Sequence, residues 1–247
     1  MTLPRGPASP ERPGAESHQT RTAIPSSTPD RVASAIVRGI LMRQFKPGQR
    51  LTEAELTRSL GVGRSTVREA FRILSSSGVL ELTPHRGAEI RTLTRADSQN
   101  LLEVMEVLAG LAARLAARNI AAGNNRARME AVAQTLRAPH SARELANVLD
   151  ERLDFYNAMF RIAANDEVNR ALPLARGHLF RTQFHQYLTA SDLRAMIGEY
   201  RRVADAILAG DERKAEQRMR KHIKRTGERT IPRLFQFAPD PVAHHGA

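Results

Sequence analysis

Apolar residues recur at helical spacing from residue 30 onwards. Val32, Ile36 and Ile40 lie four residues apart, so they predict one apolar stripe along an amphipathic helix. This helix is expected to end at Lys46-Pro47-Gly48, because proline lacks an amide donor and glycine favours a turn. Residues 1–29 contain six prolines and almost no large apolar side chains, a composition that predicts a disordered tail.

Two further helices and a hairpin follow in the first part of the chain. Thr52 to Glu55 has the spacing of a capping box, which opens a second helix. A third helix is expected over residues 65–76. Short apolar segments at 79–82 and 88–91 flank a turn and predict a β-hairpin. Three helices and a hairpin over residues 30–93 are typical of a winged helix-turn-helix domain.

Residues 94–231 return to helical periodicity, with no convincing strand. Breaks are expected at Gly123, near Pro139, at Asn165-Asp166, at Ala190-Ser191 and at Gly210-Asp211. The sequence thus predicts a mainly α protein. It combines an N-terminal winged helix-turn-helix with a C-terminal all-α antiparallel bundle of about six helices. Residues 232–247 are expected to form a flexible C-terminal tail.

Composition excludes several classes of protein. Hydrophobic residues make up 41% of the chain, and no apolar run approaches the roughly 18 residues that a membrane span needs. The N-terminus lacks the apolar segment of a secretory signal, so the expected location is the cytoplasm. Cysteine is absent, which excludes disulfides and thiolate metal sites. No glycine-rich phosphate loop, zinc-protease pair or glycine-flanked serine elbow is present, so an enzyme is not expected.

The net charge of +12 favours a polyanionic partner such as nucleic acid. Residues 28–94 carry 11 basic and 6 acidic side chains, a higher density of positive charge than residues 95–247 with 24 and 18. Most of the 38 basic residues are arginine, a bias that can also reflect genome composition. Charge alone leaves the partner open, so the motif in the first segment has to decide it.

The approach to the third predicted helix carries the chemistry of DNA recognition. A recognition helix lies in the major groove with its N-terminal residues at the base edges. Arginine there can bind both acceptors of guanine, and serine or threonine can bind phosphate. Basic side chains at the wing tip can reach the minor groove or the backbone. The residues predicted to contact DNA are Arg64, Ser65, Thr66, Arg68, Arg72, His85, Arg86 and Gly87. A winged helix used for protein contacts is the alternative.

The stretch LTEAELTRSLGVGRSTVREAFRILSSSGVLELTPHRGAEI resembles the DNA-binding domain of the GntR family. The resemblance rests on the run GVGRSTVREAFRIL, on the glycine shortly after it and on a glycine at the wing tip. It implies that Arg64 and Arg68 are the main DNA-contacting arginines, with help from Thr66 and Gly87.

The second half resembles the helical effector domain of the FadR subfamily, the FCD domain. The segments that carry this resemblance are LAGLAARLAARNI, FYNAMFRIAAND and EYRRVADAILAGDERKAEQRMRKHI. The resemblance implies that this half binds a small-molecule effector and supplies the contacts of a homodimer.

Many FCD domains bind a divalent metal through an aspartate and three histidines. In this chain those four positions are Arg152, Tyr156, Tyr200 and His222. Arginine cannot ligate a cation, neutral tyrosines are poor ligands, and one histidine cannot hold zinc. No metal and no other cofactor is therefore expected. The alternative is an altered site in which His178 and His185 join His222.

The same four side chains suit a carboxylate bound directly. Arg152 offers a guanidinium fork, Tyr156 and Tyr200 offer phenol donors, and His222 offers an imidazole. An organic acid is the expected effector. It is expected to be partly apolar, because the first effector helix lacks a polar pair that family members often carry. The alternative is a packed polar core in which tyrosines fill the space left by the lost metal.

These features predict a sequence-specific transcriptional regulator that binds an inverted-repeat operator on double-stranded DNA as a homodimer. Release of the DNA on capture of a small organic acid would make it a repressor, the common mode in this family. The alternative is a nonspecific architectural DNA-binding protein, whose affinity would depend steeply on salt and little on sequence.

Overall fold

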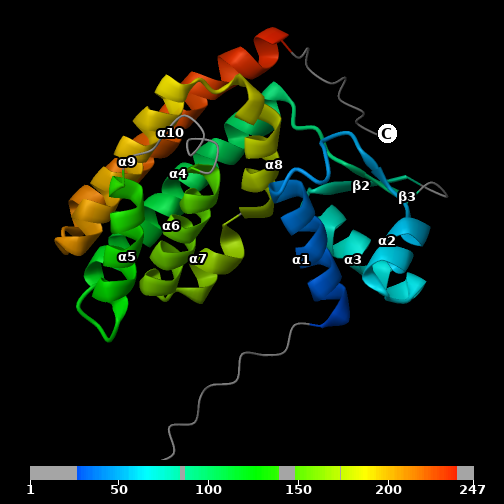
Figure 1. Cartoon of the computed structure of the whole chain (residues 1–247), viewed down its shortest axis with the longest axis horizontal. Coiled ribbons are helices and arrows are strands. Elements are labelled where there is room, and N and C mark those ends of the chain that lie inside the picture. Colours follow the sequence, from blue (N-terminus) through cyan, green and yellow to red (C-terminus); the bar gives the residue numbers. More distant parts are fainter. Residues whose placement is uncertain (1–26, 84–86, 139–147, 173, 238–247) are drawn as a thin grey trace, which may run out of the picture.

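The computed structural model describes residues 27–83, 87–138, 148–172 and 174–237, which form two parts (Figure 1). A small winged-helix part contains the first three helices and all the described strands. A larger helical bundle follows it in the chain. The predicted mainly α fold, a winged helix-turn-helix followed by an all-α bundle, is thus confirmed. Most of the predicted N-terminal tail, residues 1–26, lies outside the described residues.

The winged-helix part combines three helices with one small sheet. Its elements are α1 Thr28–Leu41, β1 Arg50–Leu51, α2 Glu53–Leu60, α3 Arg64–Ser76, β2 Leu80–Thr83 and β3 Gly87–Ile90. The strands form an antiparallel sheet in the order β1-β3-β2, with Arg50 opposite Glu89. The predicted hairpin is β2 and β3. The sequence pattern does not predict β1, because two residues are too few to show the alternation that marks a strand.

The apolar stripe predicted for α1 forms part of the core of this domain. Val32, Ile36 and Ile40 are all buried. The helix begins at Thr28, slightly before its predicted start, because Ser27 and Asp30 form a capping box. The first amides of a helix have no partner within the helix, so these two hydrogen bonds fix where α1 begins.

The bundle contains seven described α-helices and one short 3-10 helix. They are α4 Arg95–Arg118, α5 Asn125–Arg137, α6 Val148–Ala163, α7 Asp166–Ala171, α8 Leu174–Phe184, η2 His185–Tyr187, α9 Ala190–Leu208 and α10 Glu212–Phe237. The sequence predicts about six. The additional break separates α7 from α8, where Leu172 has an extended backbone and the next residue in the sequence is proline.

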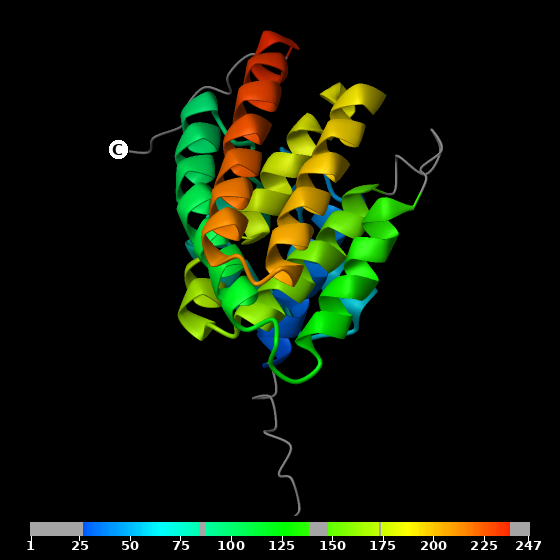
Figure 2. The ribbon, with the colours of Figure 1, turned by 90° about the vertical axis from the view of Figure 1, so that its left-hand side faces the viewer.

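The longest helices, α4 and α10, run antiparallel along one side of the bundle (Figure 2). At one end Arg118 pairs with Glu212 at 2.8 Å, and in the middle Arg220 pairs with Glu106 at 3.0 Å. At the other end the Arg95 guanidinium lies over the Phe235 ring, 5.1 Å from its centroid. These contacts hold the two helices together at both ends and in the middle.

Helix α10 continues to Phe237, which corrects the predicted start of the C-terminal tail at residue 232. Leu234 is buried, and Phe235 packs against the apolar core. Burial of these side chains keeps the helix intact beyond Pro232, even though proline removes one hydrogen bond of the helix. Residues 238–247 lie outside the described part of the chain.

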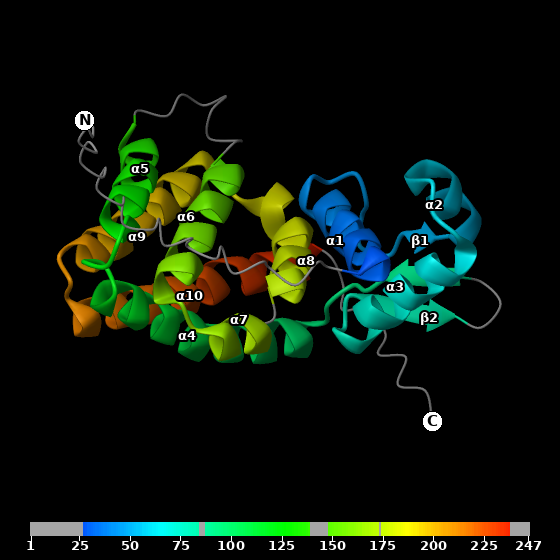
Figure 3. The same ribbon diagram turned by 90° about the horizontal axis from the view of Figure 1, so that it is seen from below.

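Helix α8 joins the bundle to the winged-helix part (Figure 3). Arg181 Nη2 donates to the carbonyl of Leu41 at 3.3 Å, and the Thr182 hydroxyl donates to the carbonyl of Ile40 at 3.3 Å. Gln183 makes two hydrogen bonds with the backbone of Leu93: it accepts from the amide at 2.8 Å and donates to the carbonyl at 3.2 Å. Three consecutive side chains of α8 thus hold α1 and the connection to α4.

Candidate functional site

Helix α3 presents one apolar and one polar face. Val67, Ala70, Phe71 and Leu74 are buried, and these are the positions whose spacing predicts a core-facing side. The helix starts after Gly63, and this N-cap glycine has no side chain that could accept from the first amides. A helix end with uncapped amides favours phosphate and other anions. The polar end of α3 therefore has the properties of a DNA-reading surface.

The predicted DNA-contacting residues of α3 differ in their surroundings. Arg64 and Ser65 are exposed at the start of the helix, and Thr66 is half-buried. Arg68 Nε donates to Glu53 Oε1 on α2 at 2.8 Å, and its side chain is still 63% exposed. Arg72 is also exposed, and its Nη1 lies 3.0 Å from Glu69 Oε2. To contact DNA, Arg68 would therefore have to give up a carboxylate partner, whereas Arg64 has none to give up among the described residues.

Gly87 begins β3 and has a φ of +87°, a conformation that favours glycine. A Cβ atom at this position would lie 2.6 Å from the carbonyl oxygen of Leu51 on β1. The glycine therefore allows the wing to pack closely against β1. His85 and Arg86, the other predicted wing contacts, lie outside the described residues.

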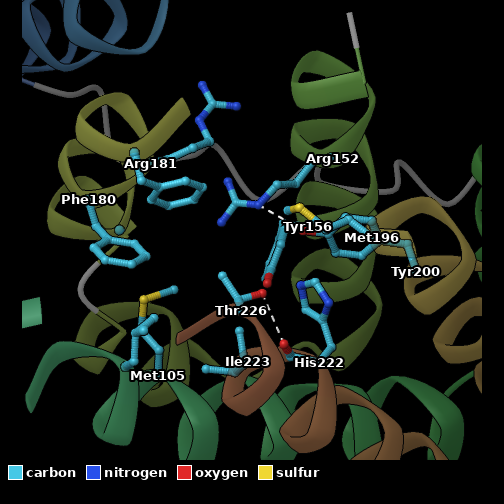
Figure 4. A pocket seen from close by; sticks show the side chains of 13 residues that line it. Met105, Arg152, Tyr156, Phe180, Arg181, Met196, Tyr200, His222, Ile223 and Thr226 are labelled. Atoms are coloured by element: carbon cyan, nitrogen blue, oxygen red, sulfur yellow. Dashed lines mark hydrogen bonds between the residues drawn. The ribbon is translucent and has the colours of Figure 1, made fainter. Parts of the chain in front are cut away.

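A small cavity lies inside the bundle, and the four predicted effector-binding residues all line it (Figure 4). Arg152 and Tyr156 come from α6, Tyr200 from α9 and His222 from α10. The free space is about 20 Å³, enough for roughly one water molecule. Its remaining lining residues are Leu102, Met105, Gly177, Phe180, Arg181, Phe184, Met196, Ile223 and Thr226. The cavity therefore combines polar groups from three helices with an apolar wall.

Arg152 is the central cation of this cavity. Its Nε donates to the Tyr200 hydroxyl at 3.0 Å, and its guanidinium carbon lies 4.6 Å from the centroid of the Tyr156 ring. No carboxylate of the described residues lies within ion-pair distance of it. A partly buried guanidinium held by a phenol and an aromatic face is well placed to receive an oxyanion.

The two tyrosines are buried and neutral. Burial raises the pKa of Tyr156 and also that of Tyr200, where the charges of Arg152 and Arg181 oppose the rise. Their rings lie 6.1 Å apart in an edge-to-face arrangement. The Tyr156 hydroxyl is buried, and no hydrogen-bond partner is found for it in the described part of the chain. It can therefore donate to a bound acceptor without breaking an existing bond.

His222 is oriented by Glu199, a residue that sequence reasoning missed. The Nδ1 atom of His222 lies 2.7 Å from Glu199 Oε2, and Arg229 Nη2 donates to Glu199 Oε1 at 3.0 Å. Although burial disfavours its charge, hydrogen bonds from His222 and Arg229 lower the pKa of Glu199. Burial lowers the pKa of His222, which outweighs the opposite effect of Glu199. A neutral His222 therefore donates from Nδ1 to an ionised Glu199.

The alternative metal set of His178, His185 and His222 is not brought together. Within the described ranges, no three His, Asp or Glu side chains are grouped so that they could hold a metal ion. Burial, with the charges of Arg152 and Arg181, lowers the pKa of His178 to about 3. The positive charge around this cavity suits an anion better than a metal ion.

Comparisons with known proteins agree with this architecture. The model of the bacterial regulatory proteins of the gntR family matches residues 28–90, and the FCD domain model matches residues 100–225. A relative described as a probable D-xylose utilization operon transcriptional repressor, from Paenarthrobacter nicotinovorans, is 30% identical over 211 residues. The match covers 83% of this chain and 87% of that protein.

Two further proteins match a similar share of this chain. The Uxu operon transcriptional regulator of Escherichia coli (strain K12) is 24% identical, with 85% of this chain and 90% of that protein covered. The solved structure of E. coli McbR/YncC has the same fold, with a TM-score of 0.64 at 19% identity; 86% of this chain and 99% of that chain are covered.

A winged helix joined to a helical bundle with an internal cavity defines a DNA-binding transcriptional regulator with a separate effector domain. This chain belongs to the GntR family and carries an FCD effector domain. The two resemblances in its sequence are thereby confirmed. None of the described helices is long and apolar enough to cross a membrane.

Proposed function

We propose that this regulator is a repressor that binds an inverted-repeat operator as a homodimer and is released by a small organic acid. The acid is bound by Arg152, Tyr156, Tyr200 and His222, without a metal ion. The observation that carries the proposal is the Arg152 guanidinium, which lines a cavity and has no carboxylate partner among the described residues. A carboxylate effector supplies the missing charge through two parallel hydrogen bonds.

The small size of the cavity means that the proposed site must open on binding. A free space of about 20 Å³ cannot hold an organic acid unless its walls move. Met105 and Met196 line it, and methionine side chains change shape easily. Movement of a wall is what regulation requires, because a ligand shifts an equilibrium only when it prefers one conformation.

An apolar strip on α4 supports the homodimer. Val104 and Val107 are 49% and 55% exposed, and the partly buried Leu108 and Leu111 lie one turn further along the helix. A second copy of this chain is the occupant that the function requires, because two DNA-reading heads on one rigid dimer explain recognition of an inverted repeat. The D-xylose operon relative is described as a repressor, which supports repression as the direction of control.

The first test is recovery of genomic DNA fragments by the purified protein. A few recovered sites that share an inverted repeat support a dimeric, sequence-specific regulator. Fragments retained evenly across the genome, with a steep dependence on salt, support the architectural alternative.

The recovered operator then permits a search for the acid. The chain has no tryptophan and three tyrosines, of which two line the cavity. Tyrosine fluorescence of a Tyr187→Phe protein therefore reports on the cavity alone. An acid that both changes this emission and releases the operator supports the proposed effector site, and an Arg152→Met protein with an unchanged response contradicts it.

A further inference from the structure

Arg181 lies in the cavity wall and also contacts the DNA-binding domain. We propose that it is an effector-binding residue and that the effector is an acid with two oxyanion groups. One group binds Arg152 and the other binds Arg181, which then gives up its hydrogen bond to Leu41. This inference rests on the proposed function, because it names the class of acid that fits the same cavity and the residue through which the acid acts.

Helix α8 faces two ways. Gly177, Phe180, Arg181 and Phe184 are spaced at three and four residues, and all four line the cavity. The opposite contacts, from Arg181 to Leu41 and from Thr182, reach the last carbonyls of α1. Arg181 is the residue of the described part of α8 that belongs to both sets, and it is only 4% exposed. A change in the contacts of its guanidinium therefore affects both the cavity and the end of α1.

The charge of the cavity favours two anionic groups. Its lining residues include two arginines and no aspartate or glutamate. Both guanidinium groups lie close to His178. Burial is the largest cause that lowers the pKa of His178, and the charges of Arg152 and Arg181 lower it further. Figure 4 shows the two side chains at the same end of the cavity. One carboxylate can bind only one of these guanidinium groups at full strength, whereas a dianion can bind both.

A carboxylate is a stronger acceptor for Arg181 than the Leu41 carbonyl. Its bond to the Leu41 carbonyl is 3.3 Å long, and the acceptor is an uncharged oxygen at the end of a helix. A hydrogen bond between guanidinium and carboxylate is shorter, at about 2.7–2.9 Å, and roughly twice as strong. Replacement of the Leu41 carbonyl by a carboxylate as acceptor is therefore favoured, and it leaves the end of α1 without one of its contacts to α8.

Loss of that contact changes how firmly the DNA-binding domain is held. Thr182 and Gln183 keep their bonds to Ile40 and Leu93, so the domain stays attached. Its orientation is less restricted, however, and a dimer can bind two half-sites tightly only when both heads keep a fixed spacing. The second oxyanion thus converts binding in the bundle into loss of operator affinity.

The test compares straight-chain dicarboxylates from malonate to adipate with monocarboxylates of equal length, by tyrosine fluorescence of the full-length Tyr187→Phe protein. The Arg181→Met protein is the variant, since methionine keeps an unbranched apolar chain without the charge. Thr182→Val is the matched control, because it removes a neighbouring contact to α1 and leaves the cavity charge unchanged. Circular dichroism and thermal unfolding establish that both variants are folded.

We expect the parent protein to bind its preferred dicarboxylate about tenfold more tightly than the matched monocarboxylate, as a charged hydrogen bond implies. The Arg181→Met protein should lose this preference, and its operator affinity should no longer fall when the dicarboxylate is added. The Thr182→Val protein should keep the preference. Equal preference in the parent and Arg181→Met proteins overturns the inference, as does a panel in which no dicarboxylate binds. The proposed function is judged separately, by operator recovery and by the response of the Arg152→Met protein to other acids.

Discussion

The Nε atom of Arg152 lies 3.0 Å from the hydroxyl oxygen of Tyr200, so a cation of the bundle cavity is held by a neutral phenol. This pair joins α6 to α9 at two of the positions to which the sequence resemblance to FCD domains assigns metal ligands. Two explanations of the cavity are compatible with this pair. The cavity is either a binding site for an acid or a packed polar core.

The Arg152→Met substitution distinguishes these explanations. If Arg152 awaits an anion, its replacement by an apolar chain of similar length should change the free energy of unfolding by less than about 1 kcal/mol, because an incompletely compensated charge is removed. The response to the effector should disappear. The control is Tyr200→Phe, which keeps the charge but removes its acceptor and should cost about 1–3 kcal/mol. Urea unfolding of both proteins measures this, and a large loss in Arg152→Met alone favours the packed core.

Arg64 and Arg68 should both be needed for operator binding. Replacement of either by alanine is expected to weaken specific binding by about 1–3 kcal/mol, the usual value for an arginine that binds guanine. Arg194→Ala, an exposed arginine in the bundle, controls for the general loss of positive charge. Fluorescence anisotropy with a labelled operator measures the affinities. Equal effects of all three substitutions would show that only general charge matters.

Gly87→Ala should destabilise the protein more than Gly61→Ala. Both glycines have a positive φ, +87° and +64°, so an alanine at either position costs roughly 1–2 kcal/mol of backbone strain. At Gly61 the new Cβ meets no atom within 4 Å, whereas at Gly87 it would lie 2.6 Å from the Leu51 carbonyl oxygen. Each substitution lowers the free energy of unfolding, and the difference between the two decreases measures the cost of this clash. Indistinguishable values would mean that the wing moves away from β1 at little cost.

The stability should fall when the pH is lowered below about 6.5, in part because of His178. Burial and the charges of Arg152 and Arg181 lower the pKa of His178 to about 3. The unfolded chain takes up a proton on this residue near pH 6.5, so between these values only the unfolded state is protonated. The contribution is complete above about pH 6.5 and declines as the pH falls towards 3. Denaturant unfolding at several pH values should give a shallower decline for His178→Gln, and parallel profiles contradict the assignment.

The exposed valines of α4 predict the site of dimerisation. Val107→Glu places a charge in the proposed interface and should produce monomers with weakened operator binding. Leu82→Glu is the control, because Leu82 is an exposed apolar residue of the wing. Light scattering coupled to size-exclusion chromatography measures the mass of each protein. A Val107→Glu protein that stays dimeric with normal operator affinity would show that the interface does not include this part of α4.

Sequence reasoning succeeds here where local pattern determines structure. The spacing of Val67, Ala70, Phe71 and Leu74 is enough to predict the buried face of α3, because an amphipathic helix repeats every 3.6 residues. The strand β1 shows the limit of the method, since Arg50 and Leu51 become a strand only through pairing with β3. Its existence depends on a partner far along the chain.

The cavity of the bundle also shows what the sequence can and cannot predict. The resemblance to the FCD domain assigns the four metal-ligand positions of that domain to Arg152, Tyr156, Tyr200 and His222, and these residues do line one cavity. It gives no indication of Arg181, because that residue enters the cavity only through the packing of α8 against the other helices. Its spacing from Gly177 and Phe184 was a usable signal, although it did not reveal which face of α8 is turned inward.

The two hydrogen bonds between Gln183 and the backbone of Leu93 fix the point at which the chain passes from the wing into α4. These bonds hold the connection between the two domains in one position, so it does not act as a free hinge. In a symmetric pair of chains, the interval between the two half-sites is then a property of the bundle, while the bases read at each half-site are a property of α3. A chimaera that carries the winged helix of another family member on this bundle should accept new half-sites at the old interval.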